Sequence, residues 1–350
     1  MSSASIVPTG TPIDVLTGGL RTNSVTLIYG PTGCGKTTLM LLAAKHLLQS
    51  RKMSKVIYID TEEGAVPIAE GPEFELRAAP SLKDQAREIK SAAEEAEQIG
   101  RVLIVVDTLT GHFHRQVLAA PETYRAARAA ELSGKLVGHI TALRNAVKNG
   151  GIAVVTAHLR SPVGDSFKMN ILRKMARAVK EGYTPTATDY ERFIAYDPVR
   201  WIGGQGLGMH CQFRFRIFVD EDKTRILMVE KWPLLNNYCV RFIMDPETGE
   251  LRAVGGRFLI DKVTLQRLKT LEFKSILGEV LEAAEKEGVE VEEEAPEAER
   301  AAARAARPQA PGAKRGAREP FKLPRVPSLR DIAEEGAEGG ADEPGDSGAG

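Results

Sequence analysis

The stretch Gly30–Thr38, GPTGCGKTT, directly follows the apolar run VTLIYG of residues 25–30 and decides the fold of this chain. A glycine, four residues and then Gly-Lys-Thr is the spacing of a phosphate-binding loop, which joins a strand to a helix. Gly33 and Gly35 allow the backbone to curl so that successive N–H groups point inward at phosphate oxygens. The stretch therefore predicts a nucleotide site within an α/β domain.

Two side chains of this loop are expected to act on a nucleoside triphosphate. Lys36 can reach the β- and γ-phosphates, and the Thr37 hydroxyl can ligate Mg²⁺. The helix over residues 38–48 adds the partial positive charge of its first turn. We expect ATP and Mg²⁺ as cofactors, and a Gly-rich turn without a ligand is the alternative. The expected nucleotide contacts in the loop are Gly30, Pro31, Thr32, Gly33, Cys34, Gly35, Lys36, Thr37 and Thr38.

Composition limits the class of protein but names no partner. The chain has 350 residues with 47 basic and 47 acidic side chains, but residues 291–350 hold nine basic and thirteen acidic ones, which leaves the remainder at about +4. Three scattered cysteines fit neither a disulfide framework nor a zinc site, and Cys34 is expected to fill the loop rather than react. Without a signal-peptide pattern or an apolar run of roughly 20 residues, we expect a cytoplasmic, nucleoid-associated protein that does not enter membranes.

The hydrophobic pattern predicts an α/β fold with a mainly parallel sheet flanked by helices. Strands that are apolar on both faces and alternate with helical stretches are typical of a covered parallel sheet. Two later segments, residues 213–232 and 236–254, read as antiparallel hairpins that turn at DEDK and DPETG. The four apolar runs are VTLIYG, KVIYID, RVLIVVD and IAVVTAH, at residues 25–30, 55–60, 101–107 and 152–158.

The chain divides into three predicted parts: a core over residues 1–258, a helical element over 259–290 and a low-complexity tail over 291–350. Asp261 can cap the start of the helical element and Gly288 its end. The tail is rich in Ala, Glu, Gly and Pro, and its few apolar residues cannot offset the entropy of ordering, so we expect disorder. Its segment FKLPRVPSLRDI, residues 321–332, is either a partner-docking motif or a plain linker.

Two strands end in carboxylates that suit nucleotide hydrolysis. Asp107 closes the run RVLIVVD, where a carboxylate beside the phosphate loop can hold magnesium through water. Glu62 follows the run KVIYID and lies between the loop and Asp107 in sequence, which suits activation of a water molecule. Glu63 is expected only to face solvent. A kinase would instead place the hydroxyl of an acceptor at this point.

These segments resemble the RecA-type recombinases of archaea and their shorter paralogues. The stretch from PTGTPID to GKTT resembles the opening of that family, YIDTE its strand with the catalytic glutamate, and LIVVDTLTG its magnesium strand. The resemblance covers about residues 8–255 in the family's order and is greatest to RadB paralogues, which consist of an ATPase core. It implies a RecA-type P-loop ATPase fold, Glu62 as the catalytic glutamate, and Asp107 and Thr37 as metal ligands.

The chain also departs from the family pattern. Where the recombinases carry Asn-Gln at the strand that senses the γ-phosphate, this chain has Ala157-His158, and His158 is either that sensor or a structural histidine. Seven residues precede the matching region, so filament assembly through a preceding aromatic motif, and with it strand exchange, is not expected. Lys231, in VEKW, lies where some members direct a cation to a neighbouring subunit's γ-phosphate; an exposed strand-end lysine is the alternative.

A basic segment after His158 is the candidate DNA-binding region. Cations with aromatic residues nearby are typical of single-strand binding, and Phe167, Tyr183 and Tyr190 accompany the cations here. The other reading is an amphipathic lid with solvated charges. In the stretch after Asp107, expected to be a loop, Arg115 and Arg125 are possible contributors, and His112 and His114 are expected at its surface. The expected DNA contacts are Arg160, Lys168, Arg173, Lys174, Arg177 and Lys180.

The sequence therefore supports three functions. The first is a DNA-modulated ATPase accessory to recombination and repair, in which ATP orders the basic segment on single-stranded DNA. The second is an ATP-dependent adaptor with little hydrolysis that binds a recombinase or another partner through the tail. The third is a small-molecule kinase, which the position of Glu62 disfavours. A homo-oligomer is compatible with each of them.

Overall fold

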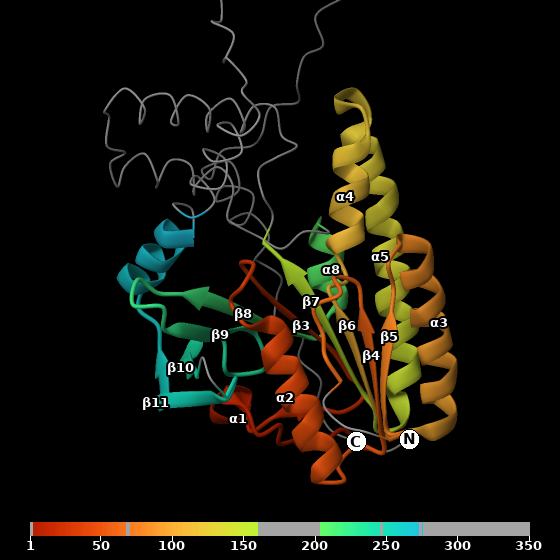
Figure 1. Cartoon of the computed structure of the whole chain (residues 1–350). Coiled ribbons are helices and arrows are strands. Elements are labelled where there is room, and N and C mark those ends of the chain that lie inside the picture. Colours follow the sequence, from red (N-terminus) through yellow and green to blue (C-terminus); the bar gives the residue numbers. More distant parts are fainter. Residues whose placement is uncertain (1–2, 68–70, 160–203, 246–247, 273–274, 276–350) are drawn as a thin grey trace, which may run out of the picture. The chain divides into compact units, whose positions relative to one another are not determined.

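A nine-stranded sheet forms the centre of the protein (Figure 1). The computed structural model describes residues 3–67, 71–159, 204–245, 248–272 and 275. Across the sheet the strands follow the order β11 (Leu251–Leu259), β10 (Tyr238–Met244), β9 (Arg225–Lys231), β8 (Phe213–Val219), β3 (Ser24–Gly30), β7 (Ile152–His158), β6 (Val102–Asp107), β4 (Lys55–Asp60) and β5 (Phe74–Ala78). A separate two-stranded antiparallel sheet pairs β1 (Ile6–Val7) with β2 (Leu20–Arg21).

The strands from β8 to β5 run parallel, and β9, β10 and β11 extend the sheet antiparallel to their neighbours. This arrangement confirms the predicted parallel sheet and both predicted hairpins. The register pairs Gly30 with His158 and Asp60 with Asp107. Because parallel strands end at the same edge, the register brings the start of the phosphate loop, His158 and both aspartates to one edge, here called the carboxyl edge.

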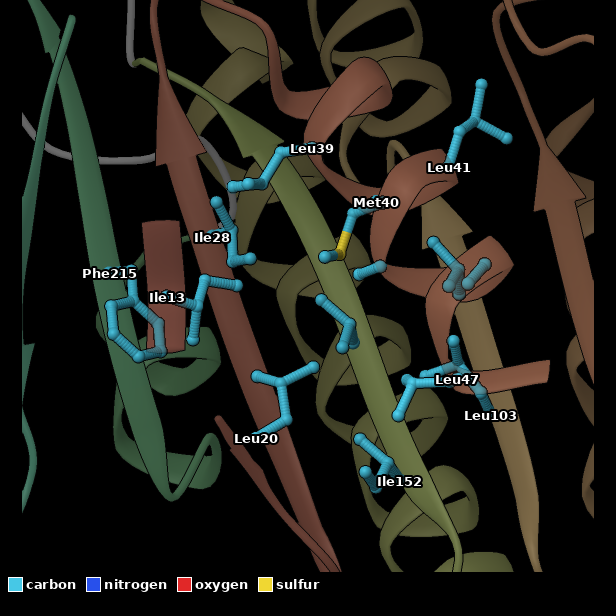
Figure 2. Close-up of a cluster of buried hydrophobic side chains, with 14 of the residues drawn as sticks. Ile13, Leu20, Ile28, Leu39, Met40, Leu41, Leu47, Leu103, Ile152 and Phe215 are labelled. Carbon is cyan, nitrogen blue, oxygen red and sulfur yellow. The ribbon is translucent and has the colours of Figure 1, made fainter. Parts of the chain in front are cut away.

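Helices cover both faces of the sheet and enclose two apolar clusters. One cluster lies under α1 (Pro12–Thr17) and α2 (Lys36–Gln49), and Figure 2 shows Ile13, Leu39 and Leu47 meeting Ile28 and Ile152 of the strands. The other cluster lies under α3 (Leu82–Ile99), α4 (Gly111–Ala119), α5 (Arg125–Ala146) and α8 (Gly204–His210). The central strands β3, β4, β6 and β7 are buried on both faces, as their almost entirely apolar sequences predict, whereas the edge strands β11 and β5 are partly exposed.

Local sequence signals set the ends of the helices. In α3, the Ser81 hydroxyl accepts the backbone N–H of Asp84 at 3.1 Å, and the helix ends at Gly100. In α1, Thr11 caps the first turn and Pro12 takes the first helical position, where the missing N–H costs nothing. The helix α2 differs because its cap residue, Gly35, offers no side chain to the first N–H groups.

A further helix over residues 262–272 packs on the antiparallel part of the sheet. The Asp261 carboxylate accepts the backbone N–H of Thr264 at 2.8 Å, as predicted for a helix cap. Leu268 of this helix joins Phe218, Ile226 and Met228 in a third buried cluster. Residues 276–350, which include the tail, lie outside the described residues, and the division of the chain into three parts stays a prediction.

Three features differ from the sequence expectations. The stretch after Asp107, expected to be a loop, forms the helix α4 and a 3₁₀ turn at Glu122–Tyr124. The helix α1 and the edge strand β5 were not predicted, because α1 has only six residues and β5 is only partly buried.

Among the described residues, no helix is both long and apolar enough to cross a lipid bilayer.

Candidate nucleotide-binding and catalytic site

The phosphate loop connects β3 to α2 at the carboxyl edge. Gly33 and Gly35 have φ angles of +73° and +97°, a left-handed conformation that L side chains rarely adopt. A Cβ atom on Gly33 would meet nothing within 4 Å, so this glycine is needed for its backbone conformation and not for space. With no side-chain cap on α2, the first N–H groups of the helix stay available to an anion.

Lys36 folds back over the loop. Its Nζ donates to the carbonyl oxygens of Gly30, at 3.2 Å, and Pro31, at 2.8 Å, and its side chain is buried. Cys34, within the loop, is fully buried, and burial raises the pKa of its thiol. The thiol therefore stays protonated, as the expected role of a loop filler requires.

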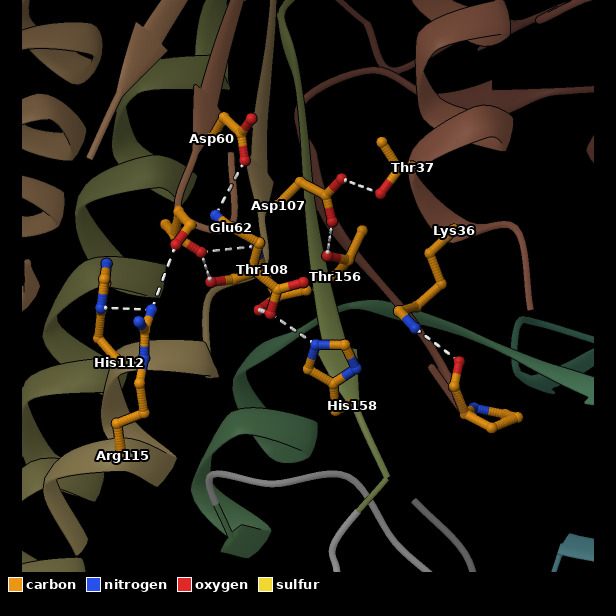
Figure 3. A network of polar contacts seen from close by, with 12 residues as sticks. Lys36, Thr37, Asp60, Glu62, Asp107, Thr108, His112, Arg115, Thr156 and His158 are labelled. Carbon is orange, nitrogen blue, oxygen red and sulfur yellow. Dashed lines mark hydrogen bonds and ion pairs between the residues drawn. The ribbon is translucent and has the colours of Figure 1, made fainter. Parts of the chain in front are cut away.

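Asp107 accepts hydrogen bonds from three hydroxyl groups, two of which, those of Thr37 and Thr156, are drawn in Figure 3. Thr37 and Tyr58 each donate to Oδ2 at 2.6 Å, and Thr156 donates to Oδ1 at 2.5 Å. Burial, followed by the charge of Asp107, raises the pKa of Tyr58, so its hydroxyl remains a neutral donor. These bonds compensate a carboxylate that is only 3% exposed. The two residues predicted to hold magnesium, Thr37 and Asp107, are thus adjacent.

Glu62 lies just beyond β4 and joins the ends of two neighbouring strands. Its Oε1 accepts the Thr108 hydroxyl at 2.9 Å and contacts Nε2 of His158 at 2.6 Å (Figure 3). Burial would raise the pKa of Glu62, but hydrogen bonds from His158 and Thr108 outweigh it and lower that pKa. Glu62 is therefore a carboxylate at neutral pH, as a base must be before it accepts a proton.

The turn that presents Glu62 is fixed by Asp60. One oxygen of Asp60 accepts the backbone N–H of Glu62 at 2.9 Å, and the other accepts that of Ala65 at 2.8 Å. Thr61 binds the carbonyl oxygen of Thr108 through its hydroxyl at 2.8 Å. The backbone on both sides of Glu62 is thereby tied to the ends of β4 and β6. Glu63 has an exposed side chain, as expected.

His112 was expected at the surface, and this expectation was wrong. Its ring is only 4% exposed, with Nε2 contacting the Ala79 carbonyl oxygen at 2.6 Å and Nδ1 the Arg115 guanidinium at 3.0 Å. Arg115 also donates to the Thr61 carbonyl oxygen at 3.3 Å. Within the described ranges, His112 and His114 belong to no group of three metal-ligating side chains. Asp60 therefore holds the backbone of Glu62 itself, and Arg115 holds that of the preceding residue, Thr61.

Lys231 ends β9 beside the helix α8. Its Nζ donates to the carbonyl oxygens of Cys211, at 2.7 Å, and Met209, at 3.4 Å. Partial burial, followed by the charge of Arg214, lowers the pKa of Lys231. These bonds satisfy carbonyl oxygens at and just beyond the end of α8, which gives Lys231 a structural role in this chain.

The predicted DNA contacts lie outside the described residues, whereas three residues near the site were missed by the sequence reasoning. Thr108 and Thr156 carry no motif of their own, although each lies within two positions of a predicted site residue. Arg225, at the start of β9, donates from Nε to the Cys34 carbonyl oxygen at 3.1 Å. No local signal could reveal Arg225, because only the sheet order brings β9 near the loop. The contacts outside the described residues are Arg160, Lys168, Arg173, Lys174, Arg177 and Lys180.

The donor set suits a magnesium nucleotide. Thr37 and Asp107 present oxygen atoms, which Mg²⁺ prefers, and the glycine loop with Lys36 supplies N–H and ammonium donors for phosphates. Glu62 supplies a carboxylate at the same edge of the sheet. The arrangement can therefore bind a triphosphate and orient a water molecule.

Known proteins share this part of the chain. The family described as "ATPase: KaiC" matches residues 7–74. The DNA repair and recombination protein RadB of Archaeoglobus fulgidus is 51% identical over 59 residues, which are 16% of this chain and 25% of that protein. RadB of Thermococcus kodakarensis is 35% identical over 136 residues, which are 35% of this chain and 56% of that protein.

A solved structure, described as the crystal structure of the RadB recombinase, superposes with a TM-score of 0.47 and 20% identity, and covers 71% of this chain and all of that one. The chain spans between a quarter and about half of the length of the two RadB relatives. Residues 7–74, which include the phosphate loop and β4, are thus similar to KaiC-type ATPases of the RecA superfamily, and RadB proteins are among the relatives of this chain.

Proposed function

We propose that this protein is an ATPase, accessory to recombination and repair, whose turnover responds to single-stranded DNA. One observation carries the proposal: the Glu62 carboxylate contacts His158 at 2.6 Å, and β7 leads from His158 into the basic segment after residue 159. The names of the RadB relatives, DNA repair and recombination proteins, support the biological setting.

In the proposed mechanism, the loop N–H groups and Lys36 bind the phosphates, and Glu62 orients the attacking water and accepts its proton. Thr37 and Asp107 would hold Mg²⁺, which supplies charge for the developing negative oxygens. Thr108 and Asp60 keep Glu62 in place while Arg115 braces the backbone beside it. Hydrolysis thus depends on a carboxylate held by residues from β4, β6 and β7.

The coupling to DNA goes through His158. Because its Nε2 contacts Glu62, a γ-phosphate that draws His158 away changes both the base and the start of the following segment. We propose that this change orders Arg160, Lys168, Arg173, Lys174, Arg177 and Lys180 on single-stranded DNA. Release of phosphate reverses it.

The decisive experiment is steady-state ATP hydrolysis with and without single-stranded DNA. We expect stimulation by DNA and no ATP binding in the control variant Lys36→Ala, which lacks the ammonium group at the phosphates. Affinity for single-stranded DNA should fall with salt, with a log–log slope of roughly −0.7 for each phosphate contacted. Turnover that DNA leaves unchanged, together with a slope near zero, would refute the proposal.

The second candidate function is an ATP-loaded adaptor. Lys231 supports it in one respect: its bonds to Cys211 and Met209 keep it within its own subunit rather than extended toward a neighbour's γ-phosphate. The adaptor would bind a recombinase or another protein through residues 321–332. Very slow, DNA-independent turnover with partner capture that is lost on deletion of these residues supports the adaptor, and capture that survives the deletion contradicts it.

Homo-oligomers and a location at the nucleoid remain proposals. If Lys231 acts across subunits, hydrolysis per subunit rises with protein concentration, and Lys231→Ala removes this dependence. Because Lys231 also binds the end of α8, the unfolding midpoint of the variant serves as the control for structural damage.

A further inference from the structure

The edge of the sheet opposite the nucleotide site is basic. Each of the four adjacent strands β3, β7, β6 and β4 is entered through a short connection, and the registers place their first residues side by side. These connections read GGLRTN, VKNGG, GR and SRKMS, at residues 18–23, 147–151, 100–101 and 50–54, and contain no acidic residue. We call their cations the entry-edge cluster: Arg21, Arg51, Lys52, Arg101 and Lys148.

The charges of the entry-edge cluster are accessible. Arg51, Lys52, Arg101 and Lys148 are exposed, and Arg21 is half-buried beside the ring of Phe213, 5.7 Å from its centre. Considering only the part of the chain that the structure describes, no carboxylate lies within ion-pair distance of these side chains. The positive charge is therefore not neutralised by an ion pair within the described fold.

A cleft of about 490 Å³ opens between members of this cluster. Lys52 and Arg101 line it together with Ser5, Thr22 and Asn149. Two cations and several hydroxyl or amide groups thus converge on one opening, and hydrogen bonds such as that from the Ser5 backbone N–H to the Thr22 hydroxyl, at 2.8 Å, hold its wall. Cationic, hydroxyl and amide side chains are the groups from which phosphate oxygens accept hydrogen bonds in protein–DNA complexes.

We propose that the entry-edge cluster binds the sugar–phosphate backbone of duplex nucleic acid. Neighbouring strands lie about 4.8 Å apart, so four strand entries extend over about 14 Å, a length along which a duplex presents several phosphates. A small anion would meet only the two cations of the cleft. The connections contain no aromatic residue on which unpaired bases could stack, which favours a duplex over a single strand.

This site goes beyond the proposed function because it lies at the opposite edge from the phosphate loop and from the segment after His158. A duplex bound here does not compete with ATP. Binding is expected without nucleotide and without preference for base sequence, since backbone contacts carry no sequence information. One protein can then contact a duplex and a single strand at separate edges of its sheet.

The test measures duplex affinity by fluorescence anisotropy at several salt concentrations, without nucleotide. The variant is Lys52→Gln/Arg101→Gln, and the matched control is Arg87→Gln/Lys90→Gln on the exposed face of α3. Each lost phosphate contact makes the slope of log affinity against log salt concentration shallower by about 0.9. The slope of the Lys52→Gln/Arg101→Gln variant should therefore be shallower than that of the parent by about 1.8, and the slope of the control should not change. Equal slopes for parent, variant and control overturn the proposal.

A second measurement uses the unaltered protein and so does not depend on the folding of a variant. Duplex DNA should protect the amines of Lys52 and Lys148 from acylation, and Lys90 should react as before. Absence of that protection overturns the proposal. Tight binding of inorganic tripolyphosphate that the Lys52→Gln/Arg101→Gln variant loses, with an unchanged duplex slope, also overturns it and indicates a small-anion site. Because the probe is a duplex without ATP, failure here leaves the single-strand-dependent ATPase untouched.

Discussion

Glu62 illustrates how tertiary contacts shape one catalytic candidate. Its carboxylate accepts a hydrogen bond from the hydroxyl of Thr108, just beyond β6, and contacts the ring of His158 at the end of β7. Its backbone N–H donates to the Asp60 carboxylate. Of these partners, only Asp60 is close to Glu62 in the sequence. The position just past a strand suggested a base, and the structure adds the donors that keep this carboxylate ionised.

Replacing Glu62 by Gln should preserve ATP binding and lower kcat by about 10²-fold or more, because the amide cannot accept the proton of water. Steady-state hydrolysis and equilibrium binding of ATP measure the two effects separately. Glu63→Gln is the matched control, since its side chain is exposed one position away and should leave kcat unchanged. Similar kcat values for Glu62→Gln and the parent would place the base elsewhere.

His158 should control the pH dependence of hydrolysis. Burial alone raises the pKa of Glu62, and the hydrogen bond from His158 is the leading effect that lowers it. The carboxylate therefore stays ionised to lower pH than an ordinary glutamate, and His158→Ala should move the acid limb of kcat/KM to higher pH. His158→Gln keeps a donor and should shift the limb less. An acid limb at the same pH in all three proteins would show that His158 does not govern Glu62.

At the scale of elements, a buried ion pair fastens the helix over residues 262–272 to β8. Arg216 is 3% exposed and donates to Glu272, which is 4% exposed, while its guanidinium lies 4.3 Å from the centre of the Phe218 ring. Tyr29, the residue before the phosphate loop, donates to Glu230 at 2.5 Å in the same region. Because Glu230 also lies 3.9 Å from the Arg216 guanidinium, the end of β3 and the helix over residues 262–272 are joined through polar side chains.

Breaking this pair should be costly. Glu272→Gln removes the nearer of the two carboxylates beside the buried Arg216 charge and leaves only Glu230, at 3.9 Å, so we expect a loss of about 3–5 kcal/mol in the free energy of unfolding, measured by denaturant titration. The control is Arg267→Gln in the same helix, which removes the ion pair between Arg267 and Asp220. Because the Arg267 side chain is 42% exposed, the loss in the free energy of unfolding should be under about 1 kcal/mol. Equal losses for the two variants would contradict a special role for the buried pair.

At the scale of the whole molecule, removal of residues 291–350 tests the predicted division of the chain. Their composition predicts that they add no packed core, so the truncated protein should keep its unfolding midpoint and its basal ATP hydrolysis. Thermal unfolding and steady-state kinetics of the two proteins measure this. A clearly lower midpoint after truncation would mean that the tail contributes to the fold.

Sequence reasoning recovered the elements whose signals are local. The four apolar runs became β3, β4, β6 and β7, and the loop glycines adopt the conformation that their spacing implied. It missed the helical nature of α4 and the burial of His112, because the contacts with Ala79 and Arg115 that bury this ring come from packing and not from periodicity. Arg225 and Thr156 were missed for the same reason.

By itself, the sequence determined the phosphate loop, the parallel strands and the two carboxylates at their ends, since spacing and hydrophobic pattern act over a few residues. Only the tertiary structure decided what surrounds those carboxylates, because strand order and register place Thr108, Thr156 and His158 beside residues that are far away along the chain. The same packing gathers the entry-edge cluster from four separate connections. Parallel strands all start at one edge of the sheet and end at the other, and this separates the positive charge of the entry-edge cluster from the nucleotide site.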